Sequence, residues 1–515
     1  MTFRRLFRIL HAVTALVLMV LFFATAAAFG LALITGGGSF GYGLLSHMRV
    51  SRGMILICLI SLGLIISGVI ILWSLVPRID KFVPPGPELL PGEHPELFKE
   101  IHRTAARAGE AAPKHVYLVP EVNAFVTQRG GVMGFGSNRV MGIGLPLLHV
   151  LSVSELRAVL AHEFGHFAGG DTKLGTWVGK TRIAIARTLN NFAGAAEASQ
   201  EVGSLALVFV VVHWPFKIFF NFYMRFTQAL SRTQEYDADA LAVRLEGPDA
   251  MTSALGKVEY ANVAYNAYFD NELAPILTRG LVPPLGNGFA QYLKVEKVDS
   301  AIKSALNDPS NRSDPDPFDS HPPHDQRIAA ISKLAAVRVA SSDSRLGIEL
   351  VNANHVRALE HQMSARWSPT EAPLEQVDWE HSHRALVVNW RRVAQEWGKY
   401  LGSEMTFASL DPSVAGAREV LAKNADLDVR GVPAEEVVRW ASQTYLCFML
   451  LALEKAGFTP SNRPGMPLTA TRGDETIEPA PMLVAWLKGE TAPETWRAQV
   501  TSLGIAEVRL ICLAV

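Results

Sequence analysis

The sequence contains little cysteine and no block of like charge. Three cysteines occur in 515 residues and none forms a CxxC pair, so neither a disulfide framework nor a cysteine-rich metal site is expected. Lysine and arginine total 48 against 49 aspartates and glutamates. With a net charge of −1 and no basic run, nothing in the composition favours nucleic-acid binding.

Charged residues are also absent from two long apolar segments, residues 12–34 and 53–76. Each exceeds the roughly 20 residues that a helix needs to cross a bilayer core. A cleaved signal peptide is the alternative for the first segment, because arginines precede it and Ala26–Ala28 offers small residues for cleavage. The apolar run continues past that point and a second run follows, so we predict a transmembrane hairpin.

Basic residues are somewhat more frequent outside this hairpin than in its connecting loop. Residues 4–8 contain three arginines and residues 78–103 contain four basic side chains, whereas the loop contains mainly Arg49 and Arg52. This asymmetry favours a cytoplasmic location for both ends. We therefore expect an integral membrane protein, in contact with lipid, whose larger part faces the cytoplasm.

The segment His162-Glu163-Phe164-Gly165-His166 has the HExxH pattern. Residues four apart share one face of a helix, so both histidines can direct their imidazoles at one metal ion while Glu163 reaches a water bound to it. Ser152 and Glu155 have capping-box spacing, which favours a helix start just before the motif. The pattern is typical of zinc hydrolases, although HExxH also arises by chance on surface helices.

A catalytic zinc ion takes three protein ligands and leaves a fourth position to water. No third histidine follows HExxH at short spacing, but the segment Ser231–Asp239 reads SRTQEYDAD. In it Glu235 and Asp239 lie one helical turn apart. Glu235 can therefore bind metal while Asp239 accepts a hydrogen bond from a ligand histidine.

Together these two segments closely resemble the gluzincin metallopeptidases of family M48, with its HtpX-like and CAAX prenyl endopeptidase branches. Asn123-Ala124-Phe125 resembles the NAF strand of that family, and residues 321–328, HPPHDQRI, resemble its HPP segment. The four motifs follow in the family's order over about residues 85–335. The resemblance implies His162, His166 and Glu235 as ligands of one zinc ion per chain.

The resemblance also implies Glu163 as the general base and places His321 and Arg327 near the reacting carbonyl. By its spacing alone, His321 is better explained as a turn histidine that caps the helix starting near Asp325, and the resemblance reverses this preference. Asp239 and Asp171 are expected to hold the ligand histidines in the required tautomer.

The NAF segment, Asn123, Ala124 and Phe125, is expected to bind substrate. The unpaired edge of a strand beside the catalytic helix can accept an extended peptide as an added strand. The alternative is an ordinary core strand, and the resemblance favours substrate binding.

The expected fold is mainly α, of the α+β class. It comprises the transmembrane hairpin at 1–83, a gluzincin-type zinc peptidase domain with a small sheet at 84–337, and a C-terminal α/β accessory region of unknown role at 338–515. Predicted helices include 95–108 and 434–456, whose residues 445–453 read as buried core. Predicted strands are at 115–119, 122–127, 139–145 and, last in the chain, 508–514.

Two further features lie outside these motifs. Residues 205–223 are apolar but include Pro215, and a single crossing there would separate the ligand histidines from Glu235. With residues 174–200 too polar for an easy return span, we expect 205–223 to lie in the interface, to re-enter, or to pack as a bent buried helix. His381 and His383 should point apart on a helix and face solvent.

The predicted function is a membrane-anchored zinc metalloendopeptidase acting on protein or peptide substrates, with a role in membrane protein quality control. The likeness to the HtpX-like branch implies the bacterial inner membrane, with the catalytic domain facing the cytoplasm. The alternatives are a CAAX-type prenyl-protein endopeptidase, against which two clear spans argue, and an inactive protease-like membrane scaffold. Cleavage specificity and oligomeric state stay open.

Overall fold

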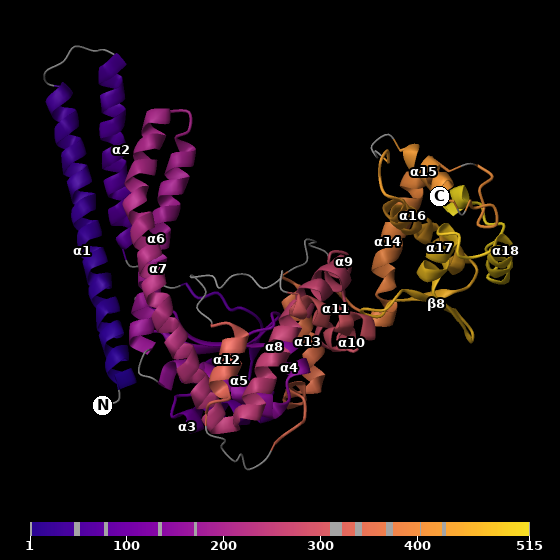
Figure 1. Cartoon of the computed structure of the whole chain (residues 1–515), viewed down its shortest axis with the longest axis horizontal. Helices are drawn as coiled ribbons and strands as arrows, with labels where there is room; N and C mark the ends of the chain where they lie inside the picture. The colour runs from indigo at the N-terminus through magenta and orange to yellow at the C-terminus, as the bar shows by residue number, and fades with distance from the viewer. Residues whose placement is uncertain are drawn as a thin grey trace. The chain divides into compact units, whose positions relative to one another are not determined.

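The structure, a computed structural model, describes residues 3–45, 52–76, 81–131, 136–168, 172–308, 322–334, 342–366, 374–401, 403–411, 413–424 and 429–513. This described part is mainly helical with three small sheets, which confirms the predicted fold class (Figure 1). The chain divides into two compact units. The N-terminal unit comprises Met1–Val119, Asn123–Lys257 and Ser310–Leu350, and the C-terminal unit comprises Pro120–Val122, Val258–Pro309 and Val351–Val515.

Four long helices of the N-terminal unit lie side by side (Figure 1). They are α1 (Phe3–Leu45), α2 (Arg52–Leu75), α6 (Thr172–Ala198) and α7 (Gly203–Glu246). Three of them, α1, α2 and α7, are long and apolar enough to cross a membrane. Their outer faces expose large apolar side chains, among them Val17, Val20, Leu207, Val211 and Trp214. A surface of this kind is suited to lipid, so the protein is a membrane protein.

The α1–α2 hairpin is held together where small residues let the two backbones approach. A side chain at Gly68 would collide with the carbonyl oxygen of Gly30. The two helices are also joined by a hydrogen bond that the hydroxyl of Ser61 on α2 donates to the carbonyl of Gly37 on α1. Close packing at glycines and interhelical hydrogen bonds are the means by which helices associate in lipid.

Helices α6 and α7 form a second hairpin, because only residues 199–202 separate them. The polar side chains of α6 find partners within the bundle: Arg182 donates to the Thr227 hydroxyl at 2.6 and 3.1 Å, and Asn191 donates to Ser74 Oγ at 2.9 Å. This explains how a helix with so many polar residues packs beside apolar ones. Helix α6 follows α5 in the chain, and α7 runs back to contact α5. The position of this hairpin relative to the bilayer stays a prediction.

A four-stranded sheet precedes the catalytic motif in the chain. Its strands are β1 (Glu88–Leu89), β2 (His115–Val119), β3 (Ala124–Arg129) and β4 (Asn138–Gly144), in the order β1-β2-β4-β3. Strands β2 and β4 are parallel, and β3 is antiparallel to β4 with Ala124 opposite Ile143. The predicted strands are therefore present, and β3 is an edge strand.

Helices α3 (Pro95–Ala108), α4 (Leu145–Val150) and α5 (Val153–Ala168) accompany this sheet. The predicted helix at 95–108 is confirmed, and its Leu97, Ile101 and Ala105 are almost fully buried. Both α3 and β3 contact α5, which also packs along α7. Later segments complete the unit: α12 (His324–Ile331) contacts α7, and the short helix η3 (Gly347–Leu350) contacts α4. Helix α5 is thus the central element around which the site forms.

The long helix α8 (Pro248–Tyr268) leads from the N-terminal unit into the C-terminal one. The further elements are η1 (Phe269–Leu273), α9 (Ala274–Leu277), β5 (Leu281–Val282), α10 (Leu285–Tyr292), α11 (Glu296–Asn307), α13 (Ala353–Ser364), β6 (Glu375–Gln376), η4 (Trp379–His381), α14 (His383–Gly398), α15 (Val414–Ala422), α16 (Ala434–Lys455), β7 (Thr459–Ser461), β8 (Thr469–Arg472), β9 (Glu475–Ile477), α17 (Pro479–Leu487), α18 (Pro493–Ser502) and η5 (Leu510–Leu513). Residues 258–309 pack within this unit, and the domain limits expected at 83 and 337 stay predictions.

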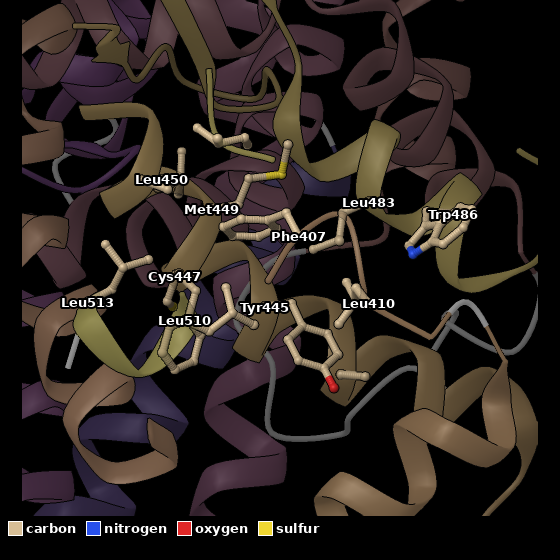
Figure 2. Close-up of a cluster of buried hydrophobic side chains, with 14 of the residues drawn as sticks. Phe407, Leu410, Tyr445, Cys447, Met449, Leu450, Leu483, Trp486, Leu510 and Leu513 are labelled. Atoms are coloured by element: carbon tan, nitrogen blue, oxygen red, sulfur yellow. The ribbon is translucent and has the colours of Figure 1, made fainter. Parts of the chain in front are cut away.

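The C-terminal unit has a hydrophobic core of its own. It is centred on α16, whose Tyr445, Cys447, Met449 and Leu450 lie among side chains of α17, η5 and the loop before α15 (Figure 2). The buried helix predicted at 445–453 is confirmed. Together with the antiparallel sheet β7-β8-β9, it forms the α/β region expected after the peptidase domain.

Two predictions for the C-terminal unit are wrong. Residues 508–514 were expected as a strand, but Leu510–Leu513 forms the 3₁₀ helix η5, because Leu510 and Leu513 share one buried face three residues apart. His383 was expected to face solvent, yet it is buried and its Nδ1 lies 2.8 Å from the carbonyl oxygen of Glu380. The helix spacing assumed there fails, since η4 ends at His381 and α14 begins at His383.

Candidate metal centre

Helix α5 begins with the capping box that the sequence predicts. The backbone N–H of Ser152 donates to Glu155 Oε2 at 2.7 Å, and the N–H of Glu155 donates to Ser152 Oγ at 3.3 Å. Lys257 and Ser253 then hold the Glu155 carboxylate at 2.8 and 2.5 Å. Burial opposes ionisation of this carboxyl, but these hydrogen bonds and the Lys257 charge lower its pKa. The start of helix α5 is therefore anchored at several points.

Helices α5 and α7 approach most closely within the motif itself. A Cβ atom at Gly165 would lie 2.7 Å from the Cα of Ala238, so a larger residue would push the two helices apart. This contact brings Glu235 and Asp239, one turn apart on α7, opposite the two histidines of α5. The sequence analysis did not identify this role of Gly165, although a glycine inside a helix is a sign of close packing.

The three expected ligands converge at one point. Nε2 of His162 lies 3.4 Å from Glu235 Oε2, and Nε2 of His166 lies 3.6 Å from Glu235 Oε1. Ligand atoms from all three residues lie within 4.8 Å of one another. A tetrahedral zinc ion with bonds of about 2.0–2.1 Å separates its ligand atoms by about 3.3 Å. The donor set of two imidazoles and one carboxylate therefore fits zinc in both chemistry and spacing.

Asp239 and Arg327 lie on the Nδ1 side of the His162 ring, opposite the nitrogen that faces Glu235. The other ring nitrogen of His162, Nδ1, lies 2.9 Å from Asp239 Oδ1, as expected for a carboxylate that orients a ligand histidine. Arg327 on α12 donates to both oxygens of Asp239, at 2.6 and 2.9 Å, and lies 3.9 Å from Glu235. This two-pronged contact is the geometry at which arginine binds carboxylates most strongly. Arg327 thus contacts Asp239 most directly, a pairing that the sequence motifs alone do not predict.

The electrostatics of the centre follow from burial and acidic neighbours. Burial disfavours a charged imidazole, but hydrogen bonds to Asp239 and Glu235, together with the charge of Glu163, raise the pKa of His162 to about 9. His162, Glu235 and Asp239 are each less than 10% exposed, whereas the side chain of His166 is 29% exposed. Of the candidate ligands, His166 is therefore the most accessible to solvent.

Of the remaining candidate site residues, Glu163 and the NAF segment at 123–125 lie within the described part of the chain. Glu163 follows His162 on α5 and is half-buried. Asn123 precedes β3 and its carbonyl accepts from the N–H of Gly144 at 2.8 Å, while Ala124 and Phe125 open the strand. Asp171 and His321 lie outside the described residues, so their proposed roles remain predictions.

Comparison with known proteins agrees with this centre. A family model described as peptidase family M48 matches residues 91–335. The protease HtpX homolog of Pyrococcus abyssi (strain GE5 / Orsay) is 30% identical over 253 residues, which cover 47% of this chain and 74% of that protein. The protease HtpX of Vibrio vulnificus (strain YJ016) is 32% identical over 173 residues, which cover 32% of this chain and 57% of that protein. No solved structure matches.

The matched region contains the three candidate ligands, Asp239 and Arg327. It includes residues 258–309 of the C-terminal unit and ends before residues 351–515 of that unit. The relatives are named as proteases, and the region matched by the family model extends over the helices and strands that build the centre. The chain therefore belongs to peptidase family M48.

Proposed function

We propose that this protein is a zinc-dependent endopeptidase that cleaves protein substrates at the membrane. The observation that carries the proposal is the convergence of His162 and His166 on α5 with Glu235 on α7, 69 residues after His166, at spacings that suit one zinc ion. Family membership supports peptide hydrolysis as the reaction. Zinc bound by these residues would polarise the scissile carbonyl and acidify a water molecule.

The side chains around the ligands supply the other functions of such a reaction. Glu163 would take the proton of the attacking water and pass it to the leaving amine. Asp239, fixed by Arg327, would keep the Nδ1–H of His162 directed away from the metal, so that Nε2 is the ligand atom. His321 would donate to the developing oxyanion, and Asp171 would orient a ligand histidine; both roles are inferred from the resemblance.

Strand β3 is proposed to bind the substrate backbone. It is the edge strand of its sheet and contacts the catalytic helix α5. In the described part of the chain no strand pairs with its outer edge. An extended peptide added along residues 124–129 would gain main-chain hydrogen bonds and lie beside the metal centre.

The membrane bundle supports a role near lipid. Three candidate spans belong to the same compact unit as the centre, so substrates near or within the membrane would be accessible to it. We propose a role in the quality control of membrane proteins at the inner membrane of a bacterial cell, with the centre on the cytoplasmic side. Lower clearance of misassembled membrane proteins in a deletion strain would support this role, and unchanged levels would contradict it.

The proposed reaction is tested on purified protein by measuring zinc content and casein cleavage for the wild type and Glu163→Gln. Because Glu163 is the base and not a ligand, we expect both proteins to hold about one zinc ion per chain and only the wild type to cleave. Glu235→Ala serves as the matched control, since it removes a ligand and should lose the metal. Full cleavage by Glu163→Gln would show that the proposed base is wrong.

A further inference from the structure

The C-terminal unit contains a cavity that the proposed peptidase mechanism does not use. It lies between α14, α15 and α16 and has a volume of about 460 Å³. Eight residues line it: Asn389, Val393, Trp397, Leu421, Trp440, Gln443, Thr444 and Cys447. The volume falls within the range of about 300–1,000 Å³ that is typical of sites for small ligands.

The walls of this cavity are apolar and aromatic. Two indoles, Trp397 and Trp440, come from different helices, and both are half-buried. Burial raises the pKa of the Cys447 thiol to about 11, which agrees with an apolar environment around that wall. Cys447 also belongs to the core drawn in Figure 2, so the cavity lies at the side of that core.

The polar groups of the lining are neutral. Asn389 and Gln443 contribute amides, and Gln443 is exposed, so its amide lies at the mouth of the cavity. The hydroxyl of Thr444 donates to the carbonyl of Trp440 at 3.1 Å. None of the eight lining residues carries a charge. A ligand with a buried charge would find no counter-charge among these eight residues, at a large cost in free energy. Outside the lining, the exposed Arg392 donates to Asn389 Oδ1 at 3.0 Å.

We propose that this cavity binds a large, uncharged apolar side chain of an extended polypeptide. The indoles and aliphatic walls match such a side chain, and the amides at the rim can bond the peptide groups on either side of it. A lipid headgroup is disfavoured because the eight lining residues offer no cation for a phosphate, and the neighbouring Arg392 already pairs with Glu396 at 3.2 Å. This inference rests on the proposed function, since exposed apolar side chains mark the unfolded proteins that an endopeptidase would capture.

The test uses the full chain in lipid nanodiscs without detergent, as the zinc-loaded Glu163→Gln variant, so that no peptide is cleaved. The probes are acetyl-GGFGG-amide and acetyl-GGEGG-amide, which differ in one side chain. Modification of Cys447 by a small thiol reagent is followed by mass spectrometry, with the exposed Cys512 as an internal reference. We expect the phenylalanine peptide to slow modification of Cys447 about tenfold at ten times its Kd, and the glutamate peptide to have no effect.

A matched pair of variants tests whether protection of Cys447 by the peptide requires the cavity. Val393→Trp fills the cavity from a half-buried wall position and should abolish protection of Cys447. Val388→Trp adds the same side chain at a position of the same helix that is 54% exposed and outside the lining, and should retain protection. The two variants are compared by the ratio of rates with and without peptide, so a change in basal reactivity cancels.

Several outcomes would overturn the inference. These are equal effects of both peptides, protection that survives Val393→Trp, or a Cys447 that is already protected by nanodisc lipid and becomes reactive when the lipid is exchanged. Binding is read without catalysis, so it is separable from the proposed function. If the peptide protected Cys447 but the wild-type protein cleaved no casein, the proposed binding cavity would be supported and only the peptidase proposal would be contradicted.

Discussion

At the scale of single residues, Asp239 is the side chain that links the candidate ligand His162 to Arg327. It is almost fully buried, accepts from His162, and receives two hydrogen bonds from Arg327. A buried carboxylate is stable only when its charge is compensated, and here the guanidinium compensates it. Arg327 therefore positions the centre through Asp239.

Asp239→Asn should weaken zinc binding by about 10-fold to 100-fold, which is typical for loss of a residue that orients a metal ligand. The amide can still accept from His162, but it loses the charge that strengthens this bond and the pairing with Arg327. Arg327→Lys, which keeps the charge and loses the two-pronged contact, should cause a smaller loss. Zinc affinity is measured by competition with a chromophoric chelator.

The control is Arg384→Lys, at an exposed ion pair with Glu375 in the C-terminal unit. It should leave zinc affinity unchanged. If Asp239→Asn bound zinc as tightly as the wild type, Asp239 would not orient the ligand histidine.

At the scale of elements, the position of α5 depends on its N-terminus. Ser152 and Glu155 close the capping box, while Lys257 and Ser253 attach Glu155 to the start of α8. Since the motif begins seven residues after Glu155, a change in this cap acts on the whole helix that carries both histidines.

Glu155→Gln should destabilise the metal-free protein by about 1 kcal/mol at neutral pH, in the range known for helix caps. The folded-state pKa of Glu155 lies below the ordinary glutamate value of 4.5, so the folded state binds this proton less readily than the unfolded state. The stabilisation is therefore present above about pH 4.5 and is lost as pH falls through the folded-state pKa. Thermal unfolding is measured from pH 7 downwards. The difference in unfolding midpoint between the wild type and Glu155→Gln should become smaller as the pH falls below about 4.5.

Glu96→Gln is the matched control, because the Glu96–Lys99 pair is exposed on α3 and such pairs contribute little. Its unfolding midpoint should stay close to that of the wild type at every pH. A gap for Glu155→Gln that stays constant down to pH 3 would rule out an ionised Glu155 as the source of the stabilisation.

At the scale of the whole molecule, the chain consists of two units with separate cores. All three candidate ligands belong to the N-terminal unit, whereas the core around α16 belongs to the C-terminal unit. A metal that binds only the folded state stabilises the part that contains its ligands, by about 4 kcal/mol at 1,000 times its Kd.

Chelation should therefore raise amide hydrogen exchange in α5 and in the part of α7 around Glu235, and leave α16 protected. Exchange is followed by mass spectrometry before chelation, after it, and after zinc is restored. In Glu235→Ala the chelator should have no effect. An equal loss of protection in α16 would mean that the two units unfold together.

Much of this architecture could be predicted, because several signals are local. The apolar runs marked α1 and α2, the spacing of Ser152 and Glu155 marked the start of α5, and glycine-rich breaks in the sequence separated the strands. The ligand residues were recognisable from motifs of a few residues each. Local patterns of this kind depend on the period of a helix or strand, which a short window of sequence contains.

Other features depend on contacts between distant segments. The return of α6 along α7, the pairing of Arg327 with Asp239, the burial of His383 and the cavity between α14 and α16 have no local signature. The final segment was predicted as a strand because its apolar residues were assigned without knowing that η5 packs against α14 and α16.

By itself the sequence determined the membrane helices, the helix of the HExxH motif and the identity of the candidate ligands. Only the tertiary structure decided that Glu235 on α7 meets His162 and His166 on α5, and that Arg327 completes the support behind them. The physical reason is that the periodicity of a helix or strand is contained in a short stretch of sequence. The meeting of candidate ligands from two helices requires close packing between those helices, as at Gly165 against Ala238.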